Sequence, residues 1–172
     1  NPKDPYGIMK LAGEVVTEGL CKLNSLPYTI IRPSAVYGPK DMNRRVSQIF
    51  IENAFHNKKI IIEGKNEKLD FTYIDDLVNG CILAAVNKKG INQIFNITYG
   101  KGQSLFKFVK VLQSRFPNLK YAIKSRDKSK PSRGTLSILK ANKLIGYKPQ
   151  YNLKKGIDKY LDFLIKNKIF QK

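Results

Sequence analysis

The sequence contains 172 residues and carries a formal charge of +19 at pH 7, with 42% hydrophobic and 10% aromatic residues. This composition excludes a disordered chain and fits one domain of modest size, or a domain with a small satellite. No apolar run approaches the roughly 20 residues of a membrane helix, and the polar, proline-bearing start does not resemble a signal peptide. We therefore expect a cytoplasmic protein without a membrane partner.

The positive charge has three interpretations. Lysines occur in every segment, as in "NKK", "KKG" and "LKK", and this spread favours a solvated basic surface. The second interpretation is an anionic small ligand such as a nucleotide diphosphate. Nucleic acid is the third and the least expected, because no basic run with interleaved aromatics and no nucleic-acid motif occurs.

Helices and short apolar strands are predicted to alternate along the chain. Asp4 is typical of an N-cap and Pro5 of a first helical turn, so apolar residues at helical spacing predict a helix over 5–24. A buried strand rich in β-formers follows at 27–33. Further helices are expected at 44–57, 77–88, 104–116, 137–146 and 153–167, further strands at 59–64, 70–74, 93–99 and 120–124, and loops at 34–43 and 126–134.

This alternation predicts an α/β fold with some parallel strands. Only 27–32 and 94–98 have the composition of core strands, which is few for a complete doubly wound sheet. We therefore expect part of the sheet to lie outside this chain.

Two cysteines, Cys21 and Cys81, fall in predicted helices. No Cys-x-x-Cys or Cys/His cluster occurs, so neither a metal site nor a disulfide framework is expected. The prediction is a pair of buried, inert thiols.

The first helix carries a pair of residues with possible chemistry. Tyr6 and Lys10 are four residues apart and therefore share a helix face. Ionising half of a phenol at pH 7 costs about 4 kcal/mol, and an ammonium at about 6 Å supplies roughly 2.8 kcal/mol at an effective dielectric near 20. A second cation, such as an oxidised nicotinamide, could supply the rest, and the tyrosinate could then accept a proton from a substrate hydroxyl. The alternative is an unreactive surface pair.

Five segments occur in one order: "PYGIMKLAGE", "TIIRPSAVYGP", "KLDFTYIDDLVNG", "IFNITYG" and "SILKANKLIGYKP", with "YNLKKGI" closing. Together they resemble the extended short-chain dehydrogenase/reductases, namely the NAD-dependent epimerase/dehydratase family near the UDP-glucose 4-epimerases. The resemblance runs from Pro5 to about Phe163. It implies the C-terminal part of a Rossmann-type doubly wound sheet and a small α/β substrate-binding lobe.

The resemblance also implies a division of the chain. Residues 1–100 would form the C-terminal part of the NAD-binding unit, with substrate-lobe segments interleaved at about 40–70, and residues 101–172 would belong mainly to the substrate-binding lobe. The family's Gly-rich loop, its ribose-binding acid and its catalytic Ser/Thr precede the Tyr/Lys helix, and no G-x-x-G-x-x-G occurs here. We therefore expect the chain to be the C-terminal portion of a longer enzyme.

By resemblance, Tyr6 would be the catalytic base, with Lys10 favouring its ionised form and binding the nicotinamide ribose. Pro33 and Ser34 would contact the nicotinamide end of NAD. The turn Tyr37-Gly38-Pro39 would lead into the substrate cleft.

Substrate contacts are also implied. Arg133 would reach the diphosphate, and Arg44 and Arg45 are weaker candidates that open a cleft-lining helix. Ala35 stands where many relatives have a diphosphate-binding Asn, and Leu69 stands where relatives often carry Arg, with Lys68 beside it. At these two positions the chain departs from the side chains that are usual in the family.

Two other features are interpreted structurally. Asp75 and Asp76 could form a carboxylate pair, but helix capping explains them better. His56 ends a predicted helix, and a solvent-facing position is favoured over catalysis.

The implied activity is NAD-dependent epimerisation or dehydration of a nucleotide-diphosphate sugar, with NAD as cofactor and a homodimer formed through the Tyr/Lys helix. Epimerisation, dehydration and reduction all stay open. The alternative is a non-catalytic remnant that binds a nucleotide sugar or a partner protein.

Overall fold

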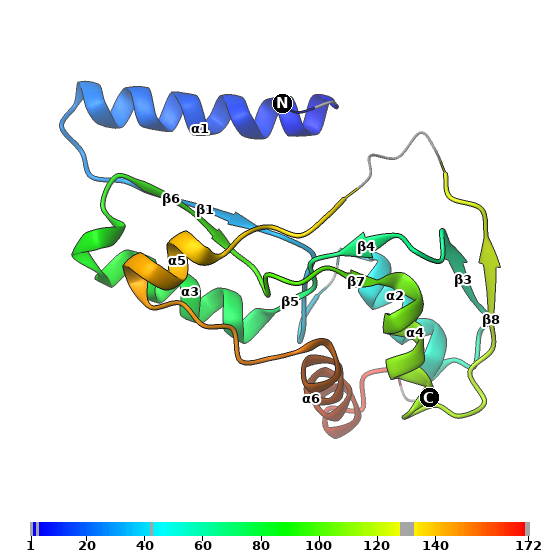
Figure 1. The fold of residues 1–172 in the computed structure, drawn as a ribbon. Coiled ribbons are helices and arrows are strands. Elements are labelled where there is room, and N and C mark those ends of the chain that lie inside the picture. The colour runs from blue at the N-terminus through cyan, green and yellow to red at the C-terminus, as the bar shows by residue number, and fades with distance from the viewer. Residues whose placement is uncertain (1, 3, 42, 128–132, 171–172) are drawn as a thin grey trace.

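A computed structural model describes residues 2, 4–41, 43–127 and 133–170 of the chain (Figure 1). The helices are α1 (Pro5–Leu23), α2 (Val46–Phe55), α3 (Ile74–Val86), the 3₁₀ turn η1 (Lys88–Gly90), α4 (Leu105–Gln113), α5 (Leu139–Ile145) and α6 (Leu153–Lys166). The strands are β1 (Thr29–Pro33), β2 (Val36–Tyr37), β3 (Ile60–Glu63), β4 (Lys68–Leu69), β5 (Thr72–Tyr73), β6 (Gln93–Ile97), β7 (Gln103–Ser104) and β8 (Tyr121–Lys124). The predicted α/β class is confirmed. None of the helices described is both long and apolar enough to cross a membrane.

The two strands expected to form the core pair with each other. β1 and β6 run parallel in a register that places Ile31 beside Phe95 and Pro33 beside Ile97. Phe95 and Ile97 are fully buried and belong to one hydrophobic cluster with Tyr147. Within the described residues β1 has no second strand neighbour, so its other edge has no β partner.

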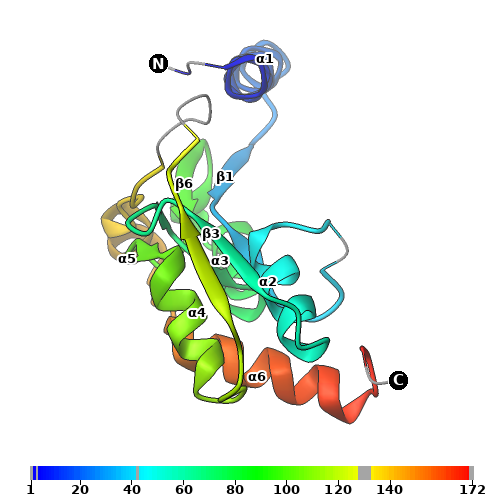
Figure 2. The same cartoon turned by 90° about the vertical axis from the view of Figure 1, so that its right-hand side faces the viewer.

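A second and larger hydrophobic core is formed by side chains of α2, α4 and α6 together with residues of β2, β3, β5 and β8. Figure 2 shows these three helices and β3 in one part of the molecule. Buried side chains recur on one face of α4 at i, i+3, i+4 and i+7, namely Leu105, Phe108, Val109 and Leu112. α6 presents a similar face with Leu153, Ile157, Tyr160, Leu161 and Leu164. Each helix begins at a side-chain cap, because Ser104 Oγ accepts from the Lys107 amide and Asn152 Oδ1 from the Lys155 amide.

The strand pairs of this core are only partly anticipated by the sequence. β3 pairs with β8 and β2 with β5, both parallel, whereas β4 and β7 are antiparallel. The strand expected at 70–74 is reduced to β5. β2, β4 and β7 were not predicted, because a strand of two residues is too short to show a period of two.

The expectation that Asp75 and Asp76 cap a helix is wrong. α3 begins at Ile74 with Tyr73 as its N-cap, and both aspartates lie inside the first turn. Asp76 is buried and accepts hydrogen bonds from two backbone amides between α5 and α6, whereas Asp75 forms an exposed 2.7 Å ion pair with Lys159. Gly146, in contrast, ends α5 in the left-handed region at φ 71°, as expected of a C-cap.

The expectation of two buried thiols is also wrong. Cys81 is exposed and Cys21 is half-buried, and both are free. The reason is that the helices carrying them present uncovered faces. α1 buries none of its residues, and α3 exposes Val78, Ile82 and Val86 beside Cys81.

A close contact between α6 and β2 gives a test of the larger core. A Cβ added at Gly156 would lie 2.1 Å from Tyr37 Oη. We expect Gly156→Ala to lower the free energy of unfolding by about 1–3 kcal/mol through overpacking, although Ala is favoured over Gly in a helix by about 1 kcal/mol. Urea denaturation followed by circular dichroism measures this difference.

The matched background for this test is Tyr37→Phe. Without the hydroxyl, the nearest atom to the new Cβ becomes Cζ at 3.0 Å, and only a long 3.5 Å hydrogen bond to the Leu153 carbonyl is lost. Gly156→Ala should therefore be less destabilising with Phe at position 37. Equal losses in the two backgrounds would contradict the contact.

Candidate functional site

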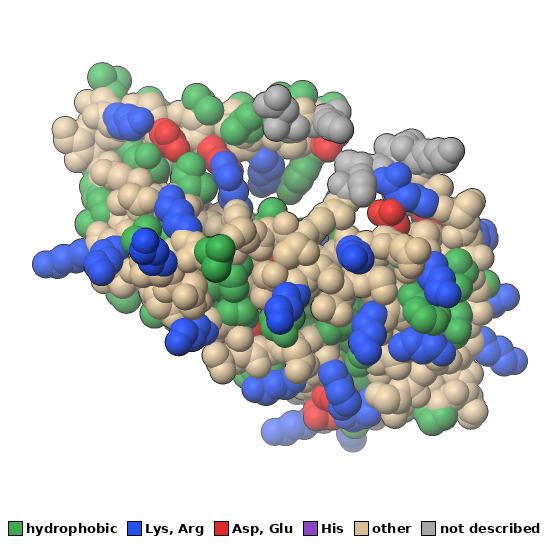
Figure 3. Space-filling model, in the orientation of Figure 1, with side chains coloured by type: hydrophobic (Ala, Val, Ile, Leu, Met, Phe, Trp, Pro, Cys, Tyr) green, Lys and Arg blue, Asp and Glu red, His purple; other side chains and the backbone are tan. Residues whose placement is uncertain are grey.

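Two cavities lie side by side on the two sides of Val46, Leu69 and Arg133. The larger, which we call the α1 cavity, has a volume of about 830 Å³ and includes residues of α1 and of the segment following β1. The smaller, the α2 cavity, has a volume of about 460 Å³ and lies between α2, β3 and β4. Val46, Leu69 and Arg133 line both, so the two cavities adjoin. Figure 3 shows the surface hollowed beneath α1, with Lys and Arg spread over this face rather than gathered in one patch.

Tyr6 and Lys10 lie next to each other on α1. Asp4 Oδ1 accepts a 2.8 Å hydrogen bond from the Gly7 amide, which caps the helix just before Tyr6. Tyr6 lines the α1 cavity with 71% of its surface exposed, and Lys10 Nζ lies 5.5 Å from the centre of its ring. The structure therefore places an ammonium beside a phenol at the cavity, and their catalytic roles remain predictions.

The other wall of the α1 cavity is the chain after β1. Pro33, Ser34 and Ala35 all line it. Ala35 has φ 38°, in the left-handed region that costs an L-residue roughly 1–2 kcal/mol, and its carbonyl accepts a 3.3 Å hydrogen bond from the Thr72 amide. The strained residue turns the chain from β1 into β2 at the cavity wall.

Three arginines were candidates for this region, and the structure separates them. Arg45 lines the α1 cavity, and Arg133 lines both cavities. Arg44 lines neither: it has φ 47° and its amide donates to Gln48 Oε1 at 2.9 Å. The expectation that Arg44 and Arg45 open the helix is wrong, because α2 begins at Val46 and Arg45 is its extended N-cap.

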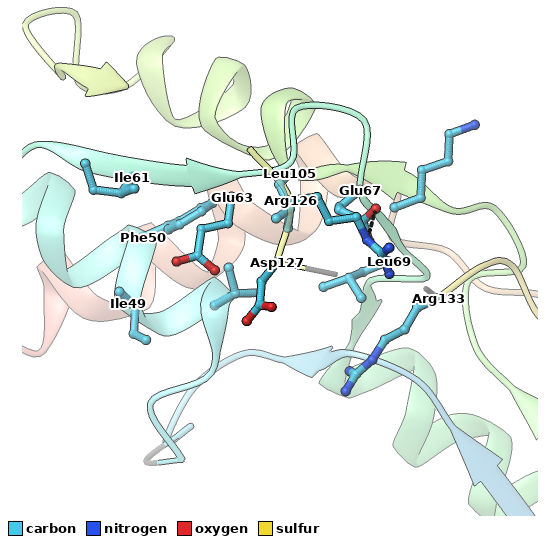
Figure 4. A pocket seen from close by; sticks show the side chains of 12 residues that line it. Ile49, Phe50, Ile61, Glu63, Glu67, Leu69, Leu105, Arg126, Asp127 and Arg133 are labelled. Carbon is cyan, nitrogen blue, oxygen red and sulfur yellow. Dashed lines mark ion pairs between the residues drawn. The ribbon is translucent and has the colours of Figure 1, made fainter. Parts of the chain in front are cut away.

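The α2 cavity combines an apolar wall with a charged rim. Phe50, Leu69 and Leu105 contribute to its apolar surface. The rim carries Glu63 and Asp127, together with an ion pair of 2.8 Å between Arg126 Nε and Glu67 Oε1 that is dashed in Figure 4. Such a cavity can accept a planar apolar group and polar or anionic groups at once.

Sequence reasoning did not find Arg126 and Asp127. Both stand in "SRDKSKPSRG", which was interpreted as a polar loop because nothing local marks these two residues as ligand-facing. The sequence signal that could have indicated a ligand-binding loop was the pair of arginines, Arg126 and Arg133, at its two ends. Residues 128–132 of this loop lie outside the described part of the chain.

The remaining predicted residues take other places. Tyr37 is buried in the larger core, where burial raises its pKa, so it does not enter the cavities. His56 is half-buried with its ring edge-on to Phe170, rather than facing solvent alone. Lys68 and Leu69 line the α2 cavity. No group of three or more potential metal ligands occurs among the described residues.

Comparison with known proteins assigns the family. The family model described as "NAD dependent epimerase/dehydratase family" matches residues 1–98 of the sequence, more than half of the chain. The chain belongs to this family.

Relatives of this epimerase/dehydratase-family chain align along nearly its whole length. A Methanocaldococcus jannaschii protein assigned the name UDP-glucose 4-epimerase is 33% identical over 97% of the chain and 55% of the relative. The Thermotoga maritima UDP-glucose 4-epimerase, solved with UDP-glucose, is 28% identical with a TM-score of 0.89 over 97% of this chain and 55% of that one. The Bacillus cereus UDP-glucuronic acid 4-epimerase, solved with UDP-glucuronic acid and NAD, is 27% identical with a TM-score of 0.87 over 97% and 54%. The chain thus has the fold of these proteins and spans about half the length of the relatives that it matches.

One ion pair connects α1 to the rest of the molecule. Arg32 of β1 binds the Glu14 carboxylate of α1 through both Nε and Nη2. Within the described part of the chain, no other hydrogen bond or ion pair joins α1 to another helix or strand. Because Arg32 directly precedes Pro33, this pair sets the position of Tyr6 relative to the opposite wall of the α1 cavity.

The ion pair of Glu14 and Arg32 predicts that the stability of the protein depends on pH. The hydrogen bond to Arg32 holds the pKa of Glu14 below the usual carboxyl range. The ion pair therefore contributes its full stability at pH values above the usual carboxyl pKa. This contribution is lost as the pH falls through the lowered pKa of Glu14. Both groups are partly solvated, so the contribution is at most about 1 kcal/mol. Carboxyl-carbon NMR titration should show the pKa of Glu14 rising in Arg32→Gln.

Arg45→Gln is the matched control for this titration, because it removes one arginine from the same region without touching Glu14. Wild type and Arg32→Gln should also differ in unfolding free energy at pH 7 and converge when Glu14 is protonated. An unchanged Glu14 titration in Arg32→Gln would show that the pair does not form in solution.

Proposed function

We propose that the chain serves in NAD-dependent conversion of a nucleotide-diphosphate sugar, as in a UDP-sugar 4-epimerase. The observation that carries the proposal is the pair of adjoining cavities: one holds Tyr6 and Ser34, the other an apolar wall with charged groups, and Arg133 lines both. A molecule with a sugar at one end and a nucleoside at the other would place its diphosphate at Arg133. Family membership supports the same reaction class.

The α2 cavity would take the nucleoside end. Phe50, Leu69 and Leu105 offer apolar contact to a base, and Asp127 can accept hydrogen bonds from ribose hydroxyls. Arg126 and Arg133 supply guanidinium donors suited to diphosphate oxygens. Ala35 has no side-chain amide to offer the diphosphate, so the arginines would carry more of this contact.

The α1 cavity would take the sugar. Tyr6 would accept the proton of a sugar hydroxyl, and the ammonium of Lys10 would stabilise the resulting phenolate because it lies 5.5 Å from the ring centre. Arg45 on the same cavity could contact the sugar side of the diphosphate.

The described residues fit the nicotinamide end of NAD, because Tyr6, Pro33 and Ser34 line one open cavity. Pro33 and Ser34 would hold the ring, and Lys10 would bind the adjoining ribose. When bound, NAD supplies the hydride acceptor for oxidation of the sugar carbon. The sequence contains no G-x-x-G-x-x-G segment for its pyrophosphate.

The second candidate function is non-catalytic binding of a nucleotide sugar or a protein. It is favoured by the 71% exposure of Tyr6, because proton transfer in a water-filled site gains little from nearby charges. This function predicts UDP-glucose binding without turnover in the presence of NAD.

Arg133 gives the binding test. Arg133→Gln should weaken UDP-glucose binding roughly tenfold in isothermal titration calorimetry, because hydrogen bonds to charged groups contribute about 1.5–3 kcal/mol each. Lys120→Gln removes the same charge from the exposed residue preceding β8, outside both cavities, and should leave the affinity unchanged. A wild type that does not bind UDP-glucose would contradict the proposal.

Turnover separates the two candidates. Mixed with NAD, UDP-glucose and a separately expressed polypeptide that supplies the Gly-rich NAD-binding segment, the chain should epimerise UDP-glucose, and Tyr6→Phe should lower the rate by about 10²-fold or more. Binding of NAD and UDP-glucose by this mixture without any turnover would favour the non-catalytic function.

We also propose that α1 forms a homodimer interface. Met9, Val16, Leu20 and Leu23 are each more than half exposed and share one stripe, on the side of the helix opposite Glu14. A polar surface helix would not carry such a stripe, whereas a helix that packs on a second copy would.

The dimer proposal predicts a position-specific effect. Val16→Lys should shift the protein from dimer to monomer in sedimentation velocity, because it places a charge within the stripe. Val15→Lys makes the same change at the neighbouring exposed residue, about 100° away around the helix, and should leave the dimer intact. A dimer that survives Val16→Lys would place the interface elsewhere, and loss of the dimer in both variants would show that the interface is not confined to this stripe.

A further inference from the structure

Asp70 lies at the centre of a hydrogen-bond cluster that joins separate segments. It is fully buried and accepts from Thr98 Oγ1 at 2.9 Å, from the Gly100 amide at 3.0 Å and from the Leu136 amide at 3.1 Å. Asp70 forms no ion pair within the described ranges, so these donors stabilise its oxygens in a site shielded from water.

The Leu136 amide belongs to the segment that carries Arg133. Two more hydrogen bonds hold this segment: the Gly102 amide donates to Thr135 Oγ1 at 2.7 Å, and Asn96 Nδ2 donates to the Ser137 carbonyl at 2.9 Å. Both of these bonds are exposed to solvent, whereas the bond to Asp70 reaches a buried acceptor. The bond to Asp70 is therefore the anchor least able to exchange with water.

The position of the Arg133 side chain depends on its backbone. Among the described residues this side chain forms no hydrogen bond or ion pair. On the other side of the cluster, Leu69 and Phe71 flank Asp70 and line the cavities. Asp70 thus connects the cavity wall to the segment that bears Arg133.

We propose that Asp70 is a positioning residue for ligand binding, which fixes the 133–137 segment so that the Arg133 guanidinium stays at the junction of the two cavities. The proposal rests on the function proposed above, because it assigns that junction to the diphosphate of the ligand. It assigns Asp70 no contact with the ligand itself.

The chain contains a matched control in Asp76. This aspartate is also buried and accepts two backbone hydrogen bonds, from Gln150 at 2.7 Å and Tyr151 at 3.0 Å, and none of the three lines either cavity. Asp70→Ala and Asp76→Ala alike remove both carboxylate oxygens and leave backbone N–H groups buried without their acceptor. Both variants should therefore lose stability.

Ligand binding separates the two variants. In calorimetry with UDP and with uridine, Asp70→Ala should bind UDP roughly tenfold more weakly and uridine within about twofold of wild type, because only UDP has the diphosphate. Asp76→Ala should change neither affinity. In the Arg133→Gln background, Asp70→Ala should have no further effect on UDP binding. Equal loss of UDP and uridine binding, or equal effects of the two Ala variants, would overturn the proposal.

A second measurement does not depend on the ligand. Hydrogen–deuterium exchange should become faster in peptides covering 133–138 in Asp70→Ala, which removes the acceptor of the Leu136 amide, and remain unchanged there in Asp76→Ala. Unchanged protection of 133–138 in Asp70→Ala would overturn the proposal. If wild type binds UDP no better than uridine, the proposed function fails, and the exchange experiment alone decides whether Asp70 fixes this segment.

Discussion

A carboxylate removed from water must find hydrogen-bond donors, and this constraint ties the described structure together. Asp70 and Asp76 are both buried and both take their donors from segments far along the chain. Asp70 connects β4 and β5 to the end of β6 and to the segment before α5, whereas Asp76 connects α3 to the chain entering α6. Removing one donor would leave a buried charge unsatisfied, so these connections resist local opening. The two hydrophobic cores are therefore linked by polar contacts as well as by packing.

The helix α1 is held in a different way. It buries no residue and meets the strands through the solvated pair of Glu14 and Arg32. Such a pair contributes little to stability, but it defines direction, because both nitrogens of one guanidinium edge engage one carboxylate. The placement of Tyr6 opposite Ser34 thus depends on a weak contact, and the exposed apolar stripe of α1 is the surface through which a second copy would strengthen it.

Much of the fold and part of the site could be predicted from the sequence. Long periodic segments predicted the helices 104–116 and 153–167 and the two core strands, because their apolar residues record which face is buried. The helix 5–24 was predicted from its capping residues and the helical spacing of its apolar residues, although none of them is buried within the chain. The ordered motifs pointed to the family and to Tyr6, Ser34 and Arg133 as neighbours in space. The two-residue strands, the buried role of Asp76 and the cavity position of Arg126 could not be predicted, because each depends on a partner remote in sequence.

The sequence by itself determined the long helices, the two core strands, the α/β class and the side-by-side placement of Tyr6 and Lys10, because each rests on periodicity, composition or spacing within a short segment. The family followed from the resemblance of several motifs in one order. Only the tertiary structure decided that Arg133 lines both cavities and that Arg44 lines neither. It also decided that Asp70 accepts a hydrogen bond from Leu136, in the segment that follows Arg133. The physical reason is that cavities and buried hydrogen bonds form between segments tens of residues apart, and local pattern carries no record of which segments meet.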